Sequence, residues 1–292
     1  MKNDRMKVPL SIVTVNYNNY DGLLKTIESI LSQTFHDFEW IVIDGGSTDG
    51  SKELLKKHSS EFYFCISEQD GGVYNAMNKG LEHVNGTYVN FMNSGDTYNS
   101  NETLANVFQQ HLVGDIVYGD WIEAYENQYK LVNAPKGGMN VLIYFTNLCH
   151  QALFVRSSIL QENGYDESYE ILADWKRWRE FACEGHKFQY IPLTICNYDC
   201  TNGKSKENSS LNNNEYYRIF HDNYLPSELL DFINEYYMKC GELNKFHESI
   251  LTKDIFLLSE RSIIRKIMHF NVIFIRKLAK FVNYITYKFN QK

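Results

Sequence analysis

The chain has 292 residues, 43% of them hydrophobic and 15% aromatic, with four prolines, so it can bury a large core and contains no long proline-rich linker. Its formal net charge is −7, yet residues 261–292 hold eight Lys or Arg and no Asp or Glu. The other residues carry 21 basic and 36 acidic side chains, and this acidic body argues against a nucleic-acid partner, because contacts to phosphates require Lys and Arg.

The first half of the chain alternates short apolar runs with amphipathic ones. Residues 8–15 are mostly β-branched and apolar, which predicts a buried parallel strand. A helix follows in which Asp21 is a candidate N-cap and apolar residues recur at helical spacing as far as Gln33. Further strands are predicted at 39–43, 62–66, 88–92 and 115–118, and further helices from about 51, over 73–84 and over 102–111. This alternation is typical of a doubly wound α/β fold with a mostly parallel sheet.

After Gly119 the alternation weakens. A hairpin is predicted from strands at 121–125 and 128–132, with further strands at 151–155, 188–191 and 193–198. A helix opens at Asp174, a polar loop spans 201–210, and the residues from 211 onward have the pattern of helices.

Cysteine usage and the N-terminus both predict a cytoplasmic protein. The closest of six scattered cysteines, Cys196 and Cys200, have no second pair or histidines at zinc spacing, which favours reduced thiols. The apolar run 8–15 is followed at once by Asn16, so it is too short for the core of a signal peptide.

Polar residues follow each of the first four predicted strands. They are Asn16-Tyr17-Asn18, Asp44-Gly45-Gly46-Ser47-Thr48-Asp49, Glu68-Gln69-Asp70-Gly71-Gly72 and Asn93-Ser94-Gly95-Asp96. Each loop alone is typical of an ordinary turn, since Asn, Asp and Gly dominate turns. The carboxyl ends of parallel strands meet at one edge of an open sheet, where ligands bind, so the four loops together predict a binding site.

These loops hold the groups that a site for a nucleotide diphosphate sugar would need. Tyr17 offers an aromatic wall and Asp44 a hydrogen-bond acceptor for the base, whereas Asp96 offers an oxygen ligand for Mg²⁺ or Mn²⁺. Such a cation would stabilise a leaving diphosphate. Asp174, at the start of its helix, is a candidate base for an acceptor hydroxyl, and the alternative is that it serves as the N-cap of that helix.

Four runs of sequence carry a resemblance to a known family. They are Val13-Thr14-Val15-Asn16-Tyr17-Asn18, Val42-Ile43-Asp44-Gly45-Gly46-Ser47-Thr48-Asp49-Gly50, Asp70-Gly71-Gly72-Val73-Tyr74-Asn75-Ala76-Met77-Asn78-Lys79-Gly80 and Phe91-Met92-Asn93-Ser94-Gly95-Asp96. These runs resemble those of glycosyltransferase family 2, particularly bacterial members that make surface polysaccharides, and a weaker similarity reaches residue 178. The resemblance implies a GT-A fold over 1–210, with a nucleotide-binding half at about 8–120, an acceptor half at about 121–210 and a helical C-terminal extension over 211–292.

The resemblance also implies a reaction. Enzymes of this kind transfer a sugar from a nucleotide-diphosphate sugar to an acceptor hydroxyl, in a single displacement that inverts the anomeric centre. UDP is the nucleotide that the resemblance favours, with dTDP and GDP as alternatives, and Mn²⁺ or Mg²⁺ is the implied cofactor. The implied acceptor is a glycan or a lipid-linked glycan.

The resemblance assigns a role to each matched position. Asp174 would be the catalytic base and Asp96 the metal ligand, while His150 and Gln151 would line the acceptor or diphosphate side. The nucleotide-binding positions would be Tyr17, Asn18, Asp44, Asp70, Lys79 and Ser94. For Lys79 the alternative is a solvated lysine on a helix surface.

Two positions depart from the family pattern. The metal motif of the family usually contains two acidic residues, whereas here Ser94 and Gly95 precede a single Asp96. Ala173 stands where many relatives have an acidic residue before the base. The first departure bears on metal affinity and the second on how the acceptor is positioned.

The basic segment 261–292 interleaves Lys and Arg with Ile, Phe and Leu. This pattern predicts a helix that lies on the inner face of a membrane, because the longest uncharged run, 267–275, is far shorter than the ~20 residues that a spanning helix needs. The alternative is a terminal helix that packs its apolar face on the body of the protein or on another subunit.

Two other functions fit parts of the pattern. A sugar nucleotidyltransferase would normally carry a Gly-rich loop with Arg or Lys after its first strand, and residues 16–20 contain neither feature. A non-catalytic module that binds glycans or serves as a scaffold would explain the missing acid at Gly95. The loss of transfer on replacing Asp96 would exclude this second alternative.

Overall fold

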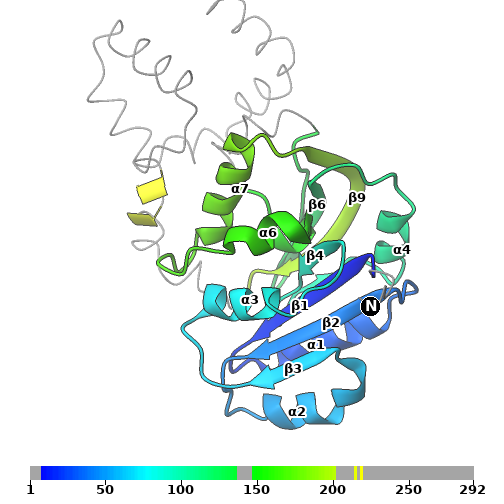
Figure 1. The fold of residues 1–292 in the computed structure, drawn as a ribbon. Helices are drawn as coiled ribbons and strands as arrows, with labels where there is room; N and C mark the ends of the chain where they lie inside the picture. Colours follow the sequence, from blue (N-terminus) through cyan, green and yellow to red (C-terminus); the bar gives the residue numbers. More distant parts are fainter. Residues whose placement is uncertain (1–7, 137–146, 202–213, 216–217, 220–292) are drawn as a thin grey trace, which may run out of the picture. The chain divides into compact units, whose positions relative to one another are not determined.

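Nine strands of the described chain form one sheet at the centre of the protein (Figure 1). The computed structural model describes residues 8–136, 147–201, 214–215 and 218–219. Along the sheet the strand order is β3-β2-β1-β4-β8-β6-β9-β5, and β7 pairs with β6. The predicted helical extension over 211–292 lies outside the described residues apart from 214–215 and 218–219, and so does the whole of the basic segment.

The four strands of the first half lie where the alternating pattern predicts them. They are β1 (Leu10–Asn16), β2 (Phe38–Asp44), β3 (Phe64–Ser67) and β4 (Tyr88–Phe91). Each pairs in parallel with its neighbour in the order β3-β2-β1-β4. Strands β1, β2 and β4 are buried along almost their whole length, as expected for parallel strands covered on both faces.

The second half adds five strands of mixed direction. They are β5 (Thr97–Tyr98), β6 (Ile116–Tyr125), β7 (Gln128–Val132), β8 (Leu153–Arg156) and β9 (Phe188–Asp199). Because β8 is antiparallel to both β4 and β6, and β9 is parallel to β6, six of the nine strands run the same way. The prediction of a mostly parallel sheet is therefore confirmed, and β9 ends at the same edge as β1 to β4.

Two pairs of predicted strands are single long strands. The predicted strands at 115–118 and 121–125 both belong to β6, and those at 188–191 and 193–198 both belong to β9. The register of β6 against β9 shifts between Tyr118 and Trp121. At that shift a Cβ atom on Gly119 would collide with the carbonyl oxygen of Leu193, so glycine allows the two backbones to approach. The break read at Gly119 is an irregularity within one strand, and the hairpin of β6 with β7 is confirmed.

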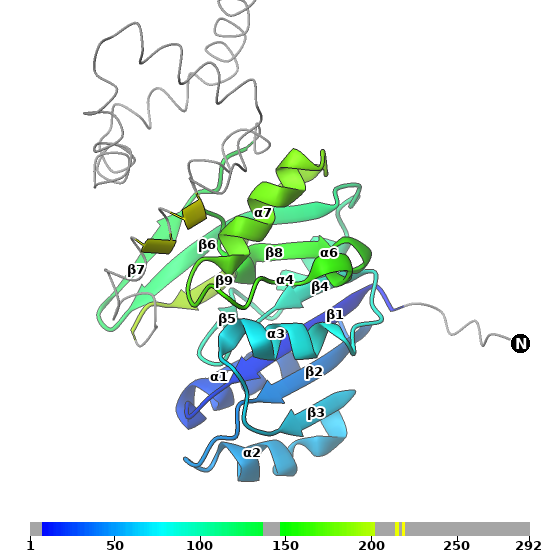
Figure 2. The same ribbon diagram turned by 60° about the vertical axis from the view of Figure 1, so that its left-hand side comes forward.

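Helices cover both faces of the sheet (Figure 2). On one face lie α1 (Tyr20–Leu31), α2 (Ser51–Lys57) and α4 (Thr103–Phe108), and on the other lie α3 (Val73–Leu81), α6 (Ser157–Asn163) and α7 (Ala173–Cys183). Short 3₁₀ turns, η1 (Ser59–Glu61) and η2 (His150–Ala152), complete the described elements. The predicted cap at Asp21 is wrong: Asn19 is the N-cap of α1, and its side chain accepts from the Gly22 amide, while Asp21 lies in the first turn.

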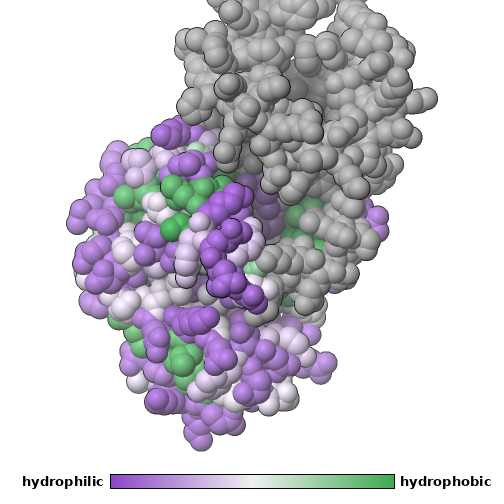
Figure 3. Space-filling model, turned by 180° about the vertical axis from the view of Figure 1, so that it is seen from behind, coloured by the Kyte–Doolittle hydropathy of each residue, from purple (hydrophilic) through white to green (hydrophobic). Residues whose placement is uncertain are grey.

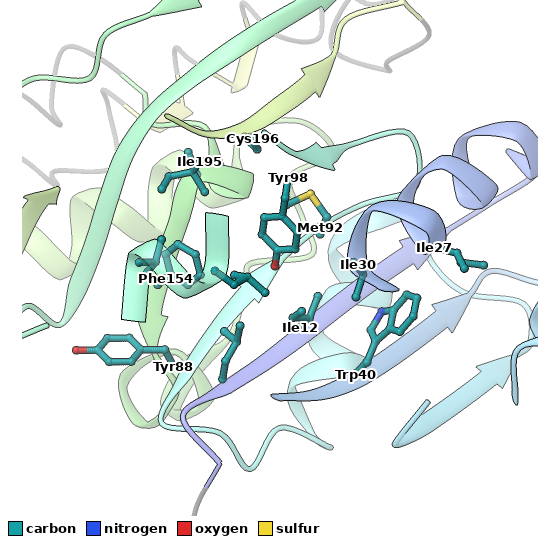
Figure 4. Close-up of a cluster of buried hydrophobic side chains, with 14 of the residues drawn as sticks. Ile12, Ile27, Ile30, Trp40, Tyr88, Met92, Tyr98, Phe154, Ile195 and Cys196 are labelled. Carbon is teal, nitrogen blue, oxygen red and sulfur yellow. The ribbon is translucent and has the colours of Figure 1, made fainter. Parts of the chain in front are cut away.

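The two faces of β1 pack against different helices. Ile12 faces α1 and belongs to a buried cluster with Ile27, Ile30 and Trp40 (Figure 4). Val13 points the opposite way, where a Cβ atom on Gly80 of α3 would lie 2.5 Å from its Cγ1 atom. This close approach of α3 to β1 is possible because Gly80 has no side chain, and it fixes the loop that precedes α3 at the edge of the sheet.

One face of the described residues is mainly polar. In Figure 3 the visible described residues are predominantly hydrophilic, with small separate hydrophobic areas. Among the described residues, no helix has both the length and the apolar character needed to cross a membrane.

Candidate active site

The loops after β1, β2, β3 and β4 meet at one edge of the sheet, as predicted. The backbone amide of Gly45 donates to the carbonyl of Asn16 at 2.9 Å, and that of Glu68 donates to the carbonyl of Asp44 at 3.0 Å. The Ser94 amide donates to the carbonyl of Val15 at 3.1 Å. The carboxyl end of β1 is therefore hydrogen-bonded to the chain on both of its sides.

Asp44 is fully buried behind these loops. Its Oδ1 atom accepts from Asn16 Nδ2 at 2.8 Å and from Ser47 Oγ, and its Oδ2 atom accepts from Ser47 N at 3.0 Å and from Ser67 Oγ. Burial by itself would raise the pKa of this carboxyl, but the hydrogen bonds from Ser47, Ser67 and Asn16 hold the pKa below its usual value. Asp44 thus connects the ends of β1, β2 and β3 and, through its bonds to Ser47, holds the loop after β2 in place.

We expect Asp44→Ala to lower the free energy of unfolding by about 3 kcal/mol, because several buried donors would lose their acceptor. The folded-state pKa lies below the unfolded one, so the carboxylate stabilises the fold above about pH 4 and this contribution is lost as pH falls through the folded-state pKa. Urea unfolding at several pH values measures both effects. Asp37→Ala, an exposed residue just before β2, should change stability by less than ~0.5 kcal/mol; equal effects of the two variants would contradict this role of Asp44.

Tyr17 and Asp70 flank Gly45 at the surface of the same edge. A Cβ atom on Gly45 would lie 2.7 Å from Asp70 Oδ2 and 3.1 Å from Tyr17 Cδ2. The Tyr17 side chain is 66% exposed, and Asp70 Oδ1 accepts from the Gly72 amide at 2.9 Å. We call this arrangement of Tyr17, Gly45 and Asp70 the Tyr17 slot. It presents an exposed aromatic ring and a partly exposed carboxylate, which lie over the buried Gly45.

Asn18 and Ser94 hold loops in place. The Asn18 amide donates to Ser47 Oγ and its Oδ1 atom accepts from the Thr48 amide, each at 2.8 Å. Asn18 has φ 46°, in the left-handed region where Asn is tolerated. Ser94 accepts at its carbonyl and its Oγ atom from Asn19 Nδ2, at 3.0 Å and 3.4 Å. Asn18 and Ser94 are thus bonded to the loop after β2 and to the N-cap of α1.

Lys79 lies on α3 against the loop after β3, where its Nζ atom is 3.5 Å from the carbonyl oxygen of Gln69. Its Nζ atom forms an ion pair with Glu68 Oε1 at 2.6 Å, and this hydrogen bond raises the pKa of the lysine, although desolvation opposes the rise. Its role in nucleotide binding and the alternative of a solvated lysine on the helix surface both stay predictions.

Asp96 is buried where β4 leads into β5. Its Oδ2 atom accepts from Gln151 Nε2 at 2.6 Å, and its Oδ1 atom accepts from the Asp199 backbone amide at 2.8 Å. Burial raises the pKa of the Asp96 carboxyl to about 7, although these two hydrogen bonds oppose the rise. Gln151, predicted to line the diphosphate side, is thus bonded directly to the predicted metal ligand.

Asp174 is buried at the start of α7 and is bonded to His150. Its Oδ2 atom lies 3.1 Å from His150 Nδ1, while His150 Nε2 lies 3.0 Å from Asn93 Nδ2. An amide nitrogen can only donate, so Nε2 accepts and Nδ1 carries the proton that His150 donates to Asp174. The carboxylate is therefore held in orientation by the imidazole of His150.

The predicted alternative role of Asp174 as N-cap is wrong. The cap position of α7 is Leu172, without a side-chain cap hydrogen bond, and Asp174 lies in the first turn. Its Oδ1 atom accepts from the Trp175 amide at 2.7 Å and lies 3.2 Å from the Tyr74 hydroxyl. The carboxylate is directed toward α3 and His150.

Sequence reasoning missed two partners of this site. Asn93 was read only as part of a loop, yet its amide orients His150. Tyr74 was read only as part of a motif, and it lies 100 positions from Asp174 in the sequence, so no local pattern indicated the contact. Asn93 could have been found, because it follows a strand as the polar residues of the other site loops do. No comparable signal existed for Tyr74.

The oxygen-rich surroundings of Asp96 suit a hard divalent cation. Within the described residues, no three His, Cys, Asp or Glu side chains are placed to hold a metal on their own. However, Asn93 Oδ1 is buried without a hydrogen-bond partner, and Asp96 supplies a carboxylate nearby in the same loop. Mg²⁺ and Mn²⁺ take oxygen ligands and complete their shell with phosphate oxygens and water, so these residues fit a metal that arrives with a diphosphate.

Solved structures with this fold are glycosyltransferases. S. aureus TarS 1-349 in complex with UDP-GlcNAc matches with a TM-score of 0.59 and 19% identity, over 72% of this chain and 64% of that one. The mannosyltransferase PcManGT from Pyrobaculum calidifontis, in complex with GDP-Man and Mn²⁺, matches with a TM-score of 0.51 and 20% identity, over 65% of this chain and 56% of that one. The chain thus spans less than two thirds of these proteins, and the likeness defines a glycosyltransferase fold of the GT-A class.

Sequence comparison places the chain within that class. The profile described as glycosyl transferase family 2 matches residues 11–152. The PGL/p-HBAD biosynthesis glycosyltransferase of Mycobacterium bovis is 32% identical over 212 residues, which are 68% of this chain and 80% of the relative. The protein of the same name from Mycobacterium tuberculosis matches equally. The chain belongs to glycosyltransferase family 2, and the predicted family is confirmed.

Proposed function

We propose that the protein transfers a sugar from a UDP-sugar to an acceptor hydroxyl with inversion, in a reaction that depends on Mn²⁺ or Mg²⁺. The observation that carries this proposal is the arrangement around η2. Its first residue, His150, is bonded to Asp174, and the next, Gln151, is bonded to Asp96. One short turn thus connects the candidate base to the candidate metal ligand. A single displacement needs a base beside the attacking hydroxyl and a cation beside the leaving diphosphate, on opposite sides of the reacting carbon.

In this proposal Asp174 takes the proton from the acceptor hydroxyl as that oxygen attacks the anomeric carbon. His150 keeps one carboxylate oxygen oriented by donating its Nδ1 proton, and the Trp175 amide does the same for the other oxygen. Holding the base in one position favours attack from a single direction. No second carboxylate is needed as a nucleophile, because inversion needs only one displacement.

The Tyr17 slot would receive the nucleoside. Tyr17 can stack on a base, and Asp70 can accept hydrogen bonds from the base or the ribose. Gly45 has no side chain, which lets Tyr17 and Asp70 approach each other at this position. TarS binds UDP and UDP-GlcNAc and PcManGT binds GDP-Man, which supports a nucleotide-sugar donor. A divalent cation bound at Asp96 would stabilise the departing diphosphate.

We further propose that the acceptor is a glycan or a lipid-linked glycan of a bacterial surface polysaccharide. The mycobacterial relatives are named as biosynthesis glycosyltransferases, which supports a biosynthetic role. The assignment of residues 121–210 to the acceptor, and the contact of residues 261–292 with the cytoplasmic face of a membrane, stay predictions.

Nucleotide binding tests the donor site. We expect UDP with Mn²⁺ to raise the melting temperature of the protein more than GDP, dTDP or CMP, since a ligand at ~100 times its Kd adds ~2.7 kcal/mol. Tyr17→Ala should weaken UDP binding about tenfold, because stacking a base on an aromatic ring is worth about 1–3 kcal/mol. The matched control is Tyr129→Ala on β7, where the tyrosine is 77% exposed and lies far along the sheet from the slot. A protein that no nucleotide stabilises would be a non-catalytic module.

A further inference from the structure

Asp199 fills the place that Gly95 leaves empty. β5 and β9 pair antiparallel with Thr97 opposite Asn197, and the same register continued by two residues brings Gly95 opposite Asp199. A Cβ atom on Gly95 would lie 3.0 Å from Asp199 Oδ2. Gly95 has φ +105°, a conformation that favours glycine, so the backbone itself disfavours an acidic residue at position 95.

The Asp199 carboxylate is held with one oxygen available. Its Oδ1 atom accepts from the Thr201 amide at 2.7 Å and from Thr201 Oγ1, while its own backbone amide donates to Asp96 Oδ1 at 2.8 Å. No described residue donates a hydrogen bond to Oδ2. The Asp199 residue is only partly buried.

We propose that Asp199 is a second carboxylate ligand of the metal site at Asp96 and replaces the acidic residue that Gly95 lacks. This inference rests on the proposed function. β9 runs parallel to β6 and, through β8, in the direction of β4, so its carboxyl end delivers Asp199 to the edge where Asp96 lies. Two carboxylates and the unpartnered Asn93 Oδ1 form an oxygen donor set of the kind that Mn²⁺ and Mg²⁺ prefer.

Titration of the full chain with Mn²⁺ in the presence of UDP, followed by the electron paramagnetic resonance of the free ion, tests this inference. We expect Asp199→Asn to weaken Mn²⁺ binding at least about tenfold. Removing residues that only hydrogen-bond to metal ligands already weakens metal binding by about this factor. Asparagine can still accept from Thr201 through its remaining oxygen, so the fold should be kept. Asp120→Asn is the matched control, because Asp120 lies on the neighbouring β6 and also accepts from a backbone amide, that of Ala134.

A change of metal preference separates a ligand from a structural residue. Asp199→Cys and Asp199→Ser differ in one atom, and a thiolate prefers soft ions. We expect the Cys variant to bind Cd²⁺ at least about tenfold more tightly than the Ser variant does, while both bind Mn²⁺ weakly. A residue that only supports the loop would show no difference between the two variants.

The outcomes distinguish this inference from the proposed function. Wild-type protein that binds Mn²⁺ with UDP, with equal affinity in Asp199→Asn and no gain of Cd²⁺ binding in Asp199→Cys, would overturn the role of Asp199 and leave the proposed function intact. Wild-type protein that retains no Mn²⁺ in the presence of UDP would overturn both.

Discussion

Asp174→Asn is expected to lower the turnover of the donor sugar by about 10²–10⁴-fold while leaving the binding of nucleotide and Mn²⁺ unchanged. An amide cannot take the proton of the acceptor hydroxyl, but its oxygen can still accept from the Trp175 amide and the Tyr74 hydroxyl. Loss of the bond to His150 should cost about 1–2 kcal/mol of stability. The release of nucleoside diphosphate from a panel of UDP-sugars measures turnover. The melting temperature with and without nucleotide and Mn²⁺ measures ligand binding.

The control for this variant is Glu162→Gln, which removes an exposed carboxylate from α6 and should leave turnover unchanged. A general base normally raises the rate at least about 10²-fold. If the turnover of Asp174→Asn stayed within about threefold of the wild-type value, the base would have to be another group. If it lost nucleotide binding as well, the defect would be structural, because Asp174 lies outside the Tyr17 slot.

The parallel half of the sheet was predictable because its signals are local. β1 and β2 are runs of mostly buried residues that end in Asn16 and Asp44, and the buried β4 is followed two residues later by Asn93. Composition therefore marks the strand, and the polar loop marks its carboxyl end. The edge where ligands gather follows from parallel pairing alone. For this reason Tyr17, Asp44, Asp70 and Asp96 could be grouped before any contact was known.

The second half depends on contacts between distant residues, which local patterns do not contain. β5 has two residues, Thr97 and Tyr98, and exists because β9 provides a partner. β6 is continuous through Gly119 because the neighbouring backbone of β9 approaches there. The direction of β9 was equally hidden, so Asp199 could not be placed beside Asp96 from the sequence.

Side-chain roles were less predictable than positions. Asp44 could be placed at the edge of the sheet, but its burial depends on Ser67 from the next strand as well as on Ser47. Lys79 could be placed near the donor loops, but its ion pair with Glu68 requires the helix and the loop to be packed. A sequence motif indicates which residues lie at the same edge of the sheet. Their hydrogen bonds and ion pairs with other residues decide which of these side chains remain open to a ligand.

Asp96→Asn is expected to separate stability from metal binding. The amide has nearly the same shape as the carboxylate, its oxygen can accept from the Asp199 amide, and its nitrogen can donate to Gln151 Oε1 if that side-chain amide turns over. Because Asp96 is buried and a buried charge is costly without a counter-ion, the metal-free variant should be at least as stable as the wild type in urea.

With UDP present, the same variant should lose the extra stabilisation that Mn²⁺ gives the wild type, and its turnover should fall about 10²–10³-fold, the range for losing one group that stabilises developing charge. Melting temperature with UDP, with and without Mn²⁺, measures the first effect. A variant that unfolds more easily without metal and yet keeps its Mn²⁺ response would show that Asp96 is a structural residue. If Asp96 is a metal ligand, we expect the opposite pattern: a stable protein whose melting temperature no longer responds to Mn²⁺.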